Sequence, residues 1–111
     1  MDWSGIRAKE IFQEVYGAKI KITPRDIGYD FEAQAPNGKI YAIEAKGTDT
    51  DSPNGRLQIK WHQIKALADA RNQGKIPVLF IANKKGDYGL FVLQHSLIEE
   101  DEYYDKEGGL P

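Results

Sequence analysis

The sequence contains no cysteine, which excludes both a disulfide framework and a thiolate metal site. It also lacks any apolar run near the ~20 residues that span a bilayer, and it lacks internal repeats and long low-complexity tracts. The opening residues, MDWSGIRAKE, show neither the basic region nor the apolar run of a signal peptide. We therefore expect an intracellular, cytoplasmic protein without a membrane segment.

Negative charge is concentrated near the C-terminal end of the sequence. The segment EEDEYYDKE near the C-terminus holds six acids and one lysine, which leaves 14 basic and 11 acidic side chains, a net +3, in residues 1–98. The 111 residues suit one domain with its own core. We expect residues 1–98 to form the body of this domain and residues 99–111 to be an acidic tail of that same domain, either solvated or partner-binding. The mildly basic body leaves a nucleic-acid partner possible.

The hydrophobic periodicity alternates between helical and strand spacing along the chain, which is typical of an α/β domain. We expect a central mixed β-sheet flanked by helices. The expected elements are helices over about 3–16 and 57–72, strands around 20–22, 28–35, 39–46, 77–83 and 87–93, a breaker-rich loop over 47–56 and a short helix from Ser96.

The turn of the central hairpin decides which side chains meet. A two-residue turn would pair Asp30 with Ala45. Pro36, however, suits the first central position of a type I turn, and Gly38 suits the left-handed residue of a three-residue loop with a G1 bulge. The residue types therefore predict the longer loop, which places Asp30 opposite Glu44.

In that register Lys46 follows on the face of Asp30 and Glu44, because residues of one parity share a face. Two carboxylates facing each other destabilise a strand pair by up to ~1 kcal/mol, and a divalent cation would offset the repulsion. A lysine beside such a cation could stabilise charge at a phosphate or help to deprotonate water. The alternative is an exposed ion-pair network without a function. The other face is expected to carry the apolar residues Tyr29, Phe31, Ala33, Tyr41, Ile43 and Ala45.

The residues Asp30 in GYDF and Glu44-Ala45-Lys46 in IEAK resemble the motif of the PD-(D/E)XK nuclease superfamily, also called the restriction-endonuclease-like fold. The order of elements is similar to the common core of that family over nearly the whole chain. The small size is similar to archaeal and phage Holliday junction resolvases, and the GYDF and IEAKGT segments are also similar to Mrr-like restriction and repair nucleases. The resemblance implies a restriction-endonuclease-like core that cleaves DNA, with branched DNA as the favoured substrate.

The resemblance also implies the roles of individual residues. Asp30 and Glu44 would be metal ligands together with the backbone carbonyl of Ala45, and Lys46 would be the catalytic lysine. The cofactor would be Mg²⁺, for which Mn²⁺ could substitute.

Three further residues match the family less closely. Glu10 corresponds to an acidic residue of the first helix that many members direct at the metal, although Glu14, one turn later, could be the residue meant. Gln63 corresponds to a helix glutamine near the site. The segment TPRDIGYD stands where resolvases have a serine-bearing loop, so the match is closer for nuclease activity than for junction specificity.

Basic side chains in the segments around the motif are candidates for phosphate contacts that carry no sequence information. These candidates are Arg7, Lys9, Arg25, Arg56 and Lys60. His62 and His95 lack ligand partners at metal spacing and are expected to be structural or surface residues, and Trp61 is expected in the core or an interface. A chain with one site would cut a symmetric junction as a homodimer. A nuclease fold that binds DNA without cutting it is the alternative outside the enzymes.

Overall fold

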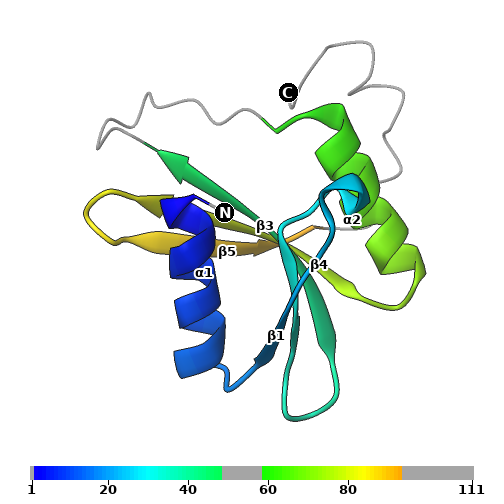
Figure 1. The fold of residues 1–111 in the computed structure, drawn as a ribbon, viewed down its shortest axis with the longest axis horizontal. Helices are drawn as coiled ribbons and strands as arrows, with labels where there is room; N and C mark the ends of the chain where they lie inside the picture. Colours follow the sequence, from blue (N-terminus) through cyan, green and yellow to red (C-terminus); the bar gives the residue numbers. More distant parts are fainter. Residues whose placement is uncertain (1, 49–58, 94–111) are drawn as a thin grey trace.

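The computed structural model describes residues 2–48 and 59–93. Helices α1 (Trp3–Glu14) and α2 (Trp61–Asn72) lie on either side of a five-stranded sheet (Figure 1). The predicted α/β architecture, a mixed sheet flanked by helices, is confirmed. The strands are β1 (Lys19–Ile22), β2 (Phe31–Gln34), β3 (Ile40–Thr48), β4 (Ile76–Asn83) and β5 (Tyr88–Val92).

The five strands are arranged in the order β1-β2-β3-β4-β5. Strands β3 and β4 are parallel and every other neighbouring pair is antiparallel. A parallel pair needs a long crossover connection, and α2 lies between β3 and β4 along the chain. Neither helix in the described part of the chain is long and apolar enough to cross a membrane.

The hairpin between β2 and β3 has the predicted three-residue loop. The Gly38 N–H donates to the Ala35 carbonyl, the Ala35 N–H donates to the Lys39 carbonyl, and each N···O distance is 2.9 Å. Gly38 has a φ of +88°, the left-handed conformation that a G1 bulge requires. Phe31 lies opposite Ile43, so the predicted register is confirmed along the whole of β2.

The start of β2 differs from the prediction. The strand begins at Phe31 instead of Gly28, because Gly28 has a φ of +98° and follows a short 3₁₀ turn at Arg25–Ile27. The alternation of faces therefore starts only at Phe31. Tyr29 was expected on the apolar face with Phe31. It packs instead with Ala42 on the other side of the sheet.

Both helices are shorter than the periodicity predicted. Helix α1 ends at Glu14, because the chain turns at Gly17, whose φ is +62°. Helix α2 begins at Trp61, because Lys60 before it is extended, with φ −75° and ψ 149°.

The breaker-rich loop also starts later than expected. Gly47 and Thr48 continue β3, where they pair with β4. The remainder of that loop, the start predicted for the second helix at 57–58, the helix expected from Ser96 and the acidic tail at 99–111 lie outside the described residues.

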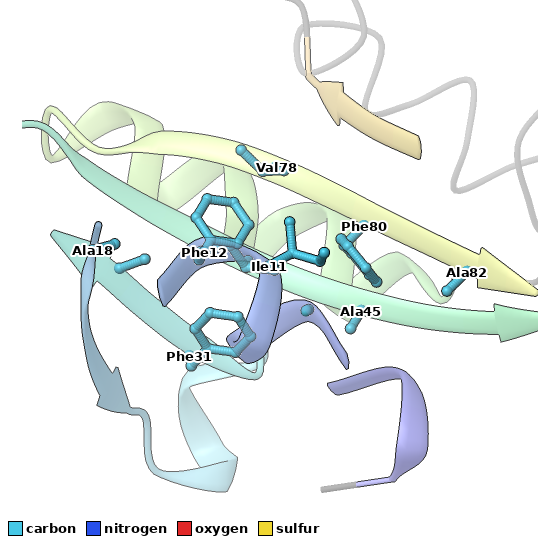
Figure 2. Packing of buried hydrophobic residues seen from close by; sticks show 11 residues of the cluster. Ile11, Phe12, Ala18, Phe31, Ala45, Val78, Phe80 and Ala82 are labelled. Atoms are coloured by element: carbon cyan, nitrogen blue, oxygen red, sulfur yellow. The ribbon is translucent and has the colours of Figure 1, made fainter. Parts of the chain in front are cut away.

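The larger core lies between α1 and the sheet. Figure 2 shows the aromatic rings of Phe12, Phe31 and Phe80 gathered around Ile11, with smaller side chains at the edges of the cluster. The sheet contributes alternate residues of each strand to this core, among them Ala45 of β3. This alternation sends the intervening residues of β3 toward α2.

The N-terminal end of α1 lies directly on the end of β3. A Cβ atom added at Gly47 would lie 2.4 Å from Cζ2 of Trp3, so the indole ring would have to shift to admit any other residue. Glycine at this position therefore allows the indole ring to lie directly against the backbone.

The opposite face of the sheet is covered by α2 through small side chains. Ala66 and Ala70 of the helix pack with Leu67, Ala42 and Tyr29, and these alanines allow the helix to approach closely. A second cluster, formed by Ile59, Ile64 and Leu79, lies beside it. Glu44 is a buried charged residue on this face.

Candidate active site

The site lies where β3 extends beyond β2. Strand β2 starts opposite Ile43, whereas β3 continues to Thr48. At this point the Asp30 N–H donates to the Ile43 carbonyl, and the Ala45 N–H donates to Oδ2 of Asp30, both at 2.9 Å. Asp30 therefore contacts the residues on both sides of Glu44. Its carboxylate replaces the hydrogen bond that a longer β2 would have provided.

Glu44 is 4% exposed and is held from two directions. Nε2 of Gln63 donates to its Oε1 at 3.0 Å, and Nζ of Lys46 lies 3.6 Å from the same oxygen. Oε1 of Gln63 accepts the N–H of Lys60 at 3.1 Å, which leaves the amide nitrogen to face Glu44. The first turn of α2 is thus tied to the middle of β3 by one side chain.

The two carboxylates carry more negative charge than their neighbours neutralise. Burial raises the pKa of Glu44 to about 7, the charge of Asp30 adds to this effect, and Lys46 opposes it. Burial also raises the pKa of Asp30, although the Ala45 N–H and the Lys46 ammonium stabilise its charged form. A site of this kind favours a further cation.

Asp2 is a third acidic residue near the pair, and the sequence analysis did not identify it. The charge of Asp2 contributes, after burial, to raising the pKa of both Asp30 and Glu44. Its Oδ1 accepts the N–H of Gly5 at 3.1 Å, so Asp2 is also the N-cap of α1. The sequence signals only the cap, because the approach to β3 depends on where α1 crosses the sheet.

The acidic residues predicted on α1 lie elsewhere. Glu10 is on the exposed side of the helix, where its Oε2 lies 3.4 Å from Nη1 of Arg7. Glu14 is also exposed, at the last position of α1. Helix α1 packs on the face of the sheet opposite to Gln63, so the structure brings Asp30, Glu44, Lys46 and Gln63 together without Glu10.

The two carboxylates suit a divalent cation held mainly by other oxygen donors. The described residues include no group of three or more His, Cys, Asp or Glu side chains that could hold a metal. Magnesium, however, is often held by one or two carboxylates, with water and substrate phosphate oxygens completing its octahedron. Asp30 and Glu44 provide such a pair. Ala45, expected to offer its carbonyl, has its amide bonded to Asp30 and its side chain in the core.

A cavity of about 300 Å³ opens beside the carboxylates. The residues that line it come from the turn before β2, from β3 and from the first turn of α2; they are Ile22, Thr23, Arg25, Gly28, Tyr29, Asp30, Glu44, His62 and Gln63.

Only some of the predicted phosphate-binding residues are near this cavity. Arg25 lines it, and Lys60 is exposed at the start of α2. Arg7 and Lys9 are on α1, and the guanidinium of Arg7 lies 6.0 Å from the centre of the Tyr88 ring. Arg56 lies outside the described residues. His62, expected to be structural or a surface residue, is exposed and lines the cavity, and half-buried Trp61 packs against the core cluster of Ile59, Ile64 and Leu79.

Comparison with protein-family models found no match for this chain, and comparison with curated proteins found none either. The arguments for a function therefore come from the motif residues and their arrangement.

Proposed function

We propose that this protein is a magnesium-dependent endonuclease that hydrolyses phosphodiester bonds in DNA, with a restriction-endonuclease-like core. The observation that carries the proposal is the pair of carboxylates on adjoining segments, Asp30 and Glu44, with Lys46 at 3.6 Å from Glu44. Burial and mutual repulsion hold the pKa of Glu44 at about 7, and a bound cation would relieve that repulsion.

Each residue would have its own role. Asp30 and Glu44 would hold Mg²⁺, or Mn²⁺ in its place, which when bound supplies a Lewis acid and lowers the pKa of bound water. The ammonium of Lys46 would stabilise negative charge that develops on the phosphate as it is attacked. Gln63 would keep the Glu44 carboxylate oriented through the hydrogen bond at 3.0 Å.

A DNA-binding module without cleavage activity is the competing function. A protein that only binds DNA gains nothing from a buried pair of carboxylates, since they repel both each other and phosphate groups. Retention of Asp30, Glu44 and Lys46 together favours the enzyme.

The assembly that we favour follows from symmetry, given the branched substrate that the family resemblance implies. Two strands of a branched DNA such as a four-way junction can be cut in a concerted way by two sites, and one chain supplies one site. We favour a homodimer that cuts branched DNA during recombination or repair, with a restriction or repair nuclease of the same fold as the alternative.

The test is cleavage of three labelled DNAs: a four-way junction, a linear duplex and a single strand, each with Mg²⁺ or with EDTA. Cleavage should require the metal, and Glu44→Gln should abolish it while the protein remains folded. Faster cleavage of the junction would support the branched substrate, and faster cleavage of the duplex would support the restriction or repair alternative. Sedimentation of the protein would report the homodimer. If wild-type protein binds DNA but cuts none of the three with Mg²⁺ or Mn²⁺, the binding module replaces the enzyme.

A further inference from the structure

Two residues on the far wall of the cavity have the chemistry to bind an anion. Arg25 belongs to the 3₁₀ turn before β2, and His62 belongs to the first turn of α2. Both line the cavity that contains Asp30 and Glu44, and both are exposed to solvent. The ion pairs found among residues 2–48 and 59–93 involve neither of them. Both residues therefore border the cavity without an ionic partner among the described residues.

The backbone segments that carry Arg25 and His62 meet at a close contact. A Cβ atom added at Gly28 would lie 2.7 Å from Cβ of Ala66 and 3.5 Å from the carbonyl oxygen of His62. The φ of +98° at Gly28 also disfavours any other residue. The turn that carries Arg25 therefore lies directly against α2. This contact sets the width of the cavity before any ligand binds.

The two ends of the site would contact different parts of a ligand. Lys46 interacts with Glu44 but is not among the residues that line the cavity. An anion beside Lys46 and an anion between Arg25 and His62 would therefore be two separate groups. A DNA strand presents such groups at regular intervals along its backbone.

We infer that Arg25 and His62 bind the phosphate next to the one that is cut, on the same DNA strand. The inference rests on the proposed nuclease function and adds residues that position its substrate. The guanidinium offers several N–H donors to a phosphate, and the imidazole ring offers at least one in either tautomer. Holding the neighbouring phosphate places the scissile phosphate over Asp30 and Glu44, which is a positioning effect.

The experiment uses DNA in which one phosphate is replaced by an uncharged methylphosphonate. The group is placed one position to either side of the cut in the junction or duplex that wild-type protein cleaves. Wild-type protein should bind one of these two DNAs about tenfold more weakly, because one charge-assisted hydrogen-bonded contact is lost. Arg25→Ala should bind the natural DNA about tenfold more weakly and show no further loss with that methylphosphonate. His62→Ala should behave in the same way with a smaller loss, and His62→Gln, which keeps a donor, should recover part of it.

The matched control is Lys65→Ala, which removes an exposed cation from α2 that does not line the cavity. This variant should respond to the methylphosphonate as the wild type does. Saturating Arg25→Ala or His62→Ala protein should restore the single-turnover rate to within about tenfold of wild type, because these residues position the substrate and do not act on the transition state.

Two results would overturn the inference in different ways. If wild-type protein cuts DNA but Arg25→Ala and His62→Ala lose as much affinity as wild type with each methylphosphonate, neither residue contacts that phosphate and the nuclease assignment is unaffected. If wild-type protein cuts no DNA with Mg²⁺ or Mn²⁺, the proposed function fails and this inference fails with it.

Discussion

Two glutamates on the α2 face of the sheet occupy similar places and have opposite electrostatics. Glu32 of β2 and Glu44 of β3 lie on neighbouring strands, and their side chains are 13% and 5% exposed. Nζ of Lys75 lies 2.8 Å from Oε2 of Glu32, and the hydroxyl of Tyr29 donates to the same oxygen at 2.5 Å. Burial alone would raise the pKa of Glu32, but these two donors hold it below its usual value.

Glu44 is more deeply buried and has weaker compensation. Burial and then repulsion by the neighbouring Asp30 carboxylate raise its pKa to about 7, and Lys46, 3.6 Å away, only partly opposes this rise. The comparison teaches that burial of a glutamate does not by itself mark a site. Glu32 has its own cation and serves the fold, whereas Glu44 favours a further cation besides Lys46.

The largest expected difference between the two glutamates is in the cleavage rate after removal of the lysine beside each of them. Lys46→Ala should reduce the single-turnover cleavage rate on the order of 100-fold or more, because a charge aimed at the transition state is lost. DNA affinity should stay within roughly tenfold of wild type, since one phosphate contact contributes modestly to binding. The rate is measured with saturating enzyme and Mg²⁺, and the affinity without metal.

Lys75→Met is the matched control for that measurement. It removes a lysine from the other glutamate and should leave the single-turnover rate nearly unchanged. Cleavage by Lys46→Ala at the wild-type rate would remove Lys46 from the catalytic residues.

The second largest expected difference between Glu44 and Glu32 is in how each makes the stability of the fold depend on pH. A carboxylate whose pKa is raised in the folded state holds its proton more tightly than in the unfolded state, so stability falls as pH rises. In EDTA, the free energy of unfolding should therefore fall between pH 4.5 and about 7, the ordinary and folded pKa values of Glu44. The drop should be at most on the order of 3 kcal/mol. Glu44→Gln should remove most of it in urea unfolding experiments.

The pH dependence of stability that Glu32 contributes has the opposite sign. Its pKa is lowered in the folded state, so its stabilisation is present at neutral pH and is lost as pH falls below the usual glutamate range. A wild-type protein whose stability rises steadily from pH 4.5 to 7 in EDTA would contradict the charge imbalance at Glu44.

Thermodynamic coupling between Glu32 and Lys75 should be smaller but measurable. Lys75→Met should destabilise the fold by about 1–3 kcal/mol, because it leaves the mostly buried Glu32 carboxylate without its cation. Glu32→Gln combined with Lys75→Met should restore part of that loss, and a double-mutant cycle measures it. Additive losses in the cycle would show that the 2.8 Å ion pair does not stabilise the fold.

Asp2→Asn should have the smallest effect on stability and should sharpen the assignment of the carboxylates. Asparagine still caps a helix, so stability at low pH should change by about a few tenths of a kcal/mol. Removal of the charge should lower the pKa of Glu44, because Asp2 raises it in the wild type. The pH titration of Glu44, followed by NMR in EDTA, should shift to lower pH, and an unchanged titration would place Asp2 outside the site.

The arrangement of the central hairpin could be predicted from residue types alone. Pro36 and Gly38 favour one loop length, and that length fixes which residues of β2 and β3 face each other. The grouping of Asp30, Glu44 and Lys46 follows from local chemistry. Gln63 joins them through a helix whose position was implied only by the family resemblance.

Other parts of the site depend on contacts between distant segments. The alternation of strand residues could not place Tyr29, because the turn at Gly28 exists to fit against Ala66 of α2. Asp2 reaches the carboxylates because α1 crosses the sheet with its first turn over β3. Helical periodicity marks which side of α1 is buried, but it does not fix the direction in which the helix lies. Glu10 was expected at the metal only from the family resemblance, with Glu14 as the alternative.

The contact between Trp3 and Gly47 links the α1 face of the sheet to the site on the α2 face. The indole lies against the backbone of Gly47 on one face, and the next residue back, Lys46, projects to the other. A methyl group at position 47 would push against the indole ring of Trp3, which follows Asp2 directly at the start of α1. A substitution on the α1 face of the sheet is thus expected to change the electrostatics of a site on the α2 face without touching that site.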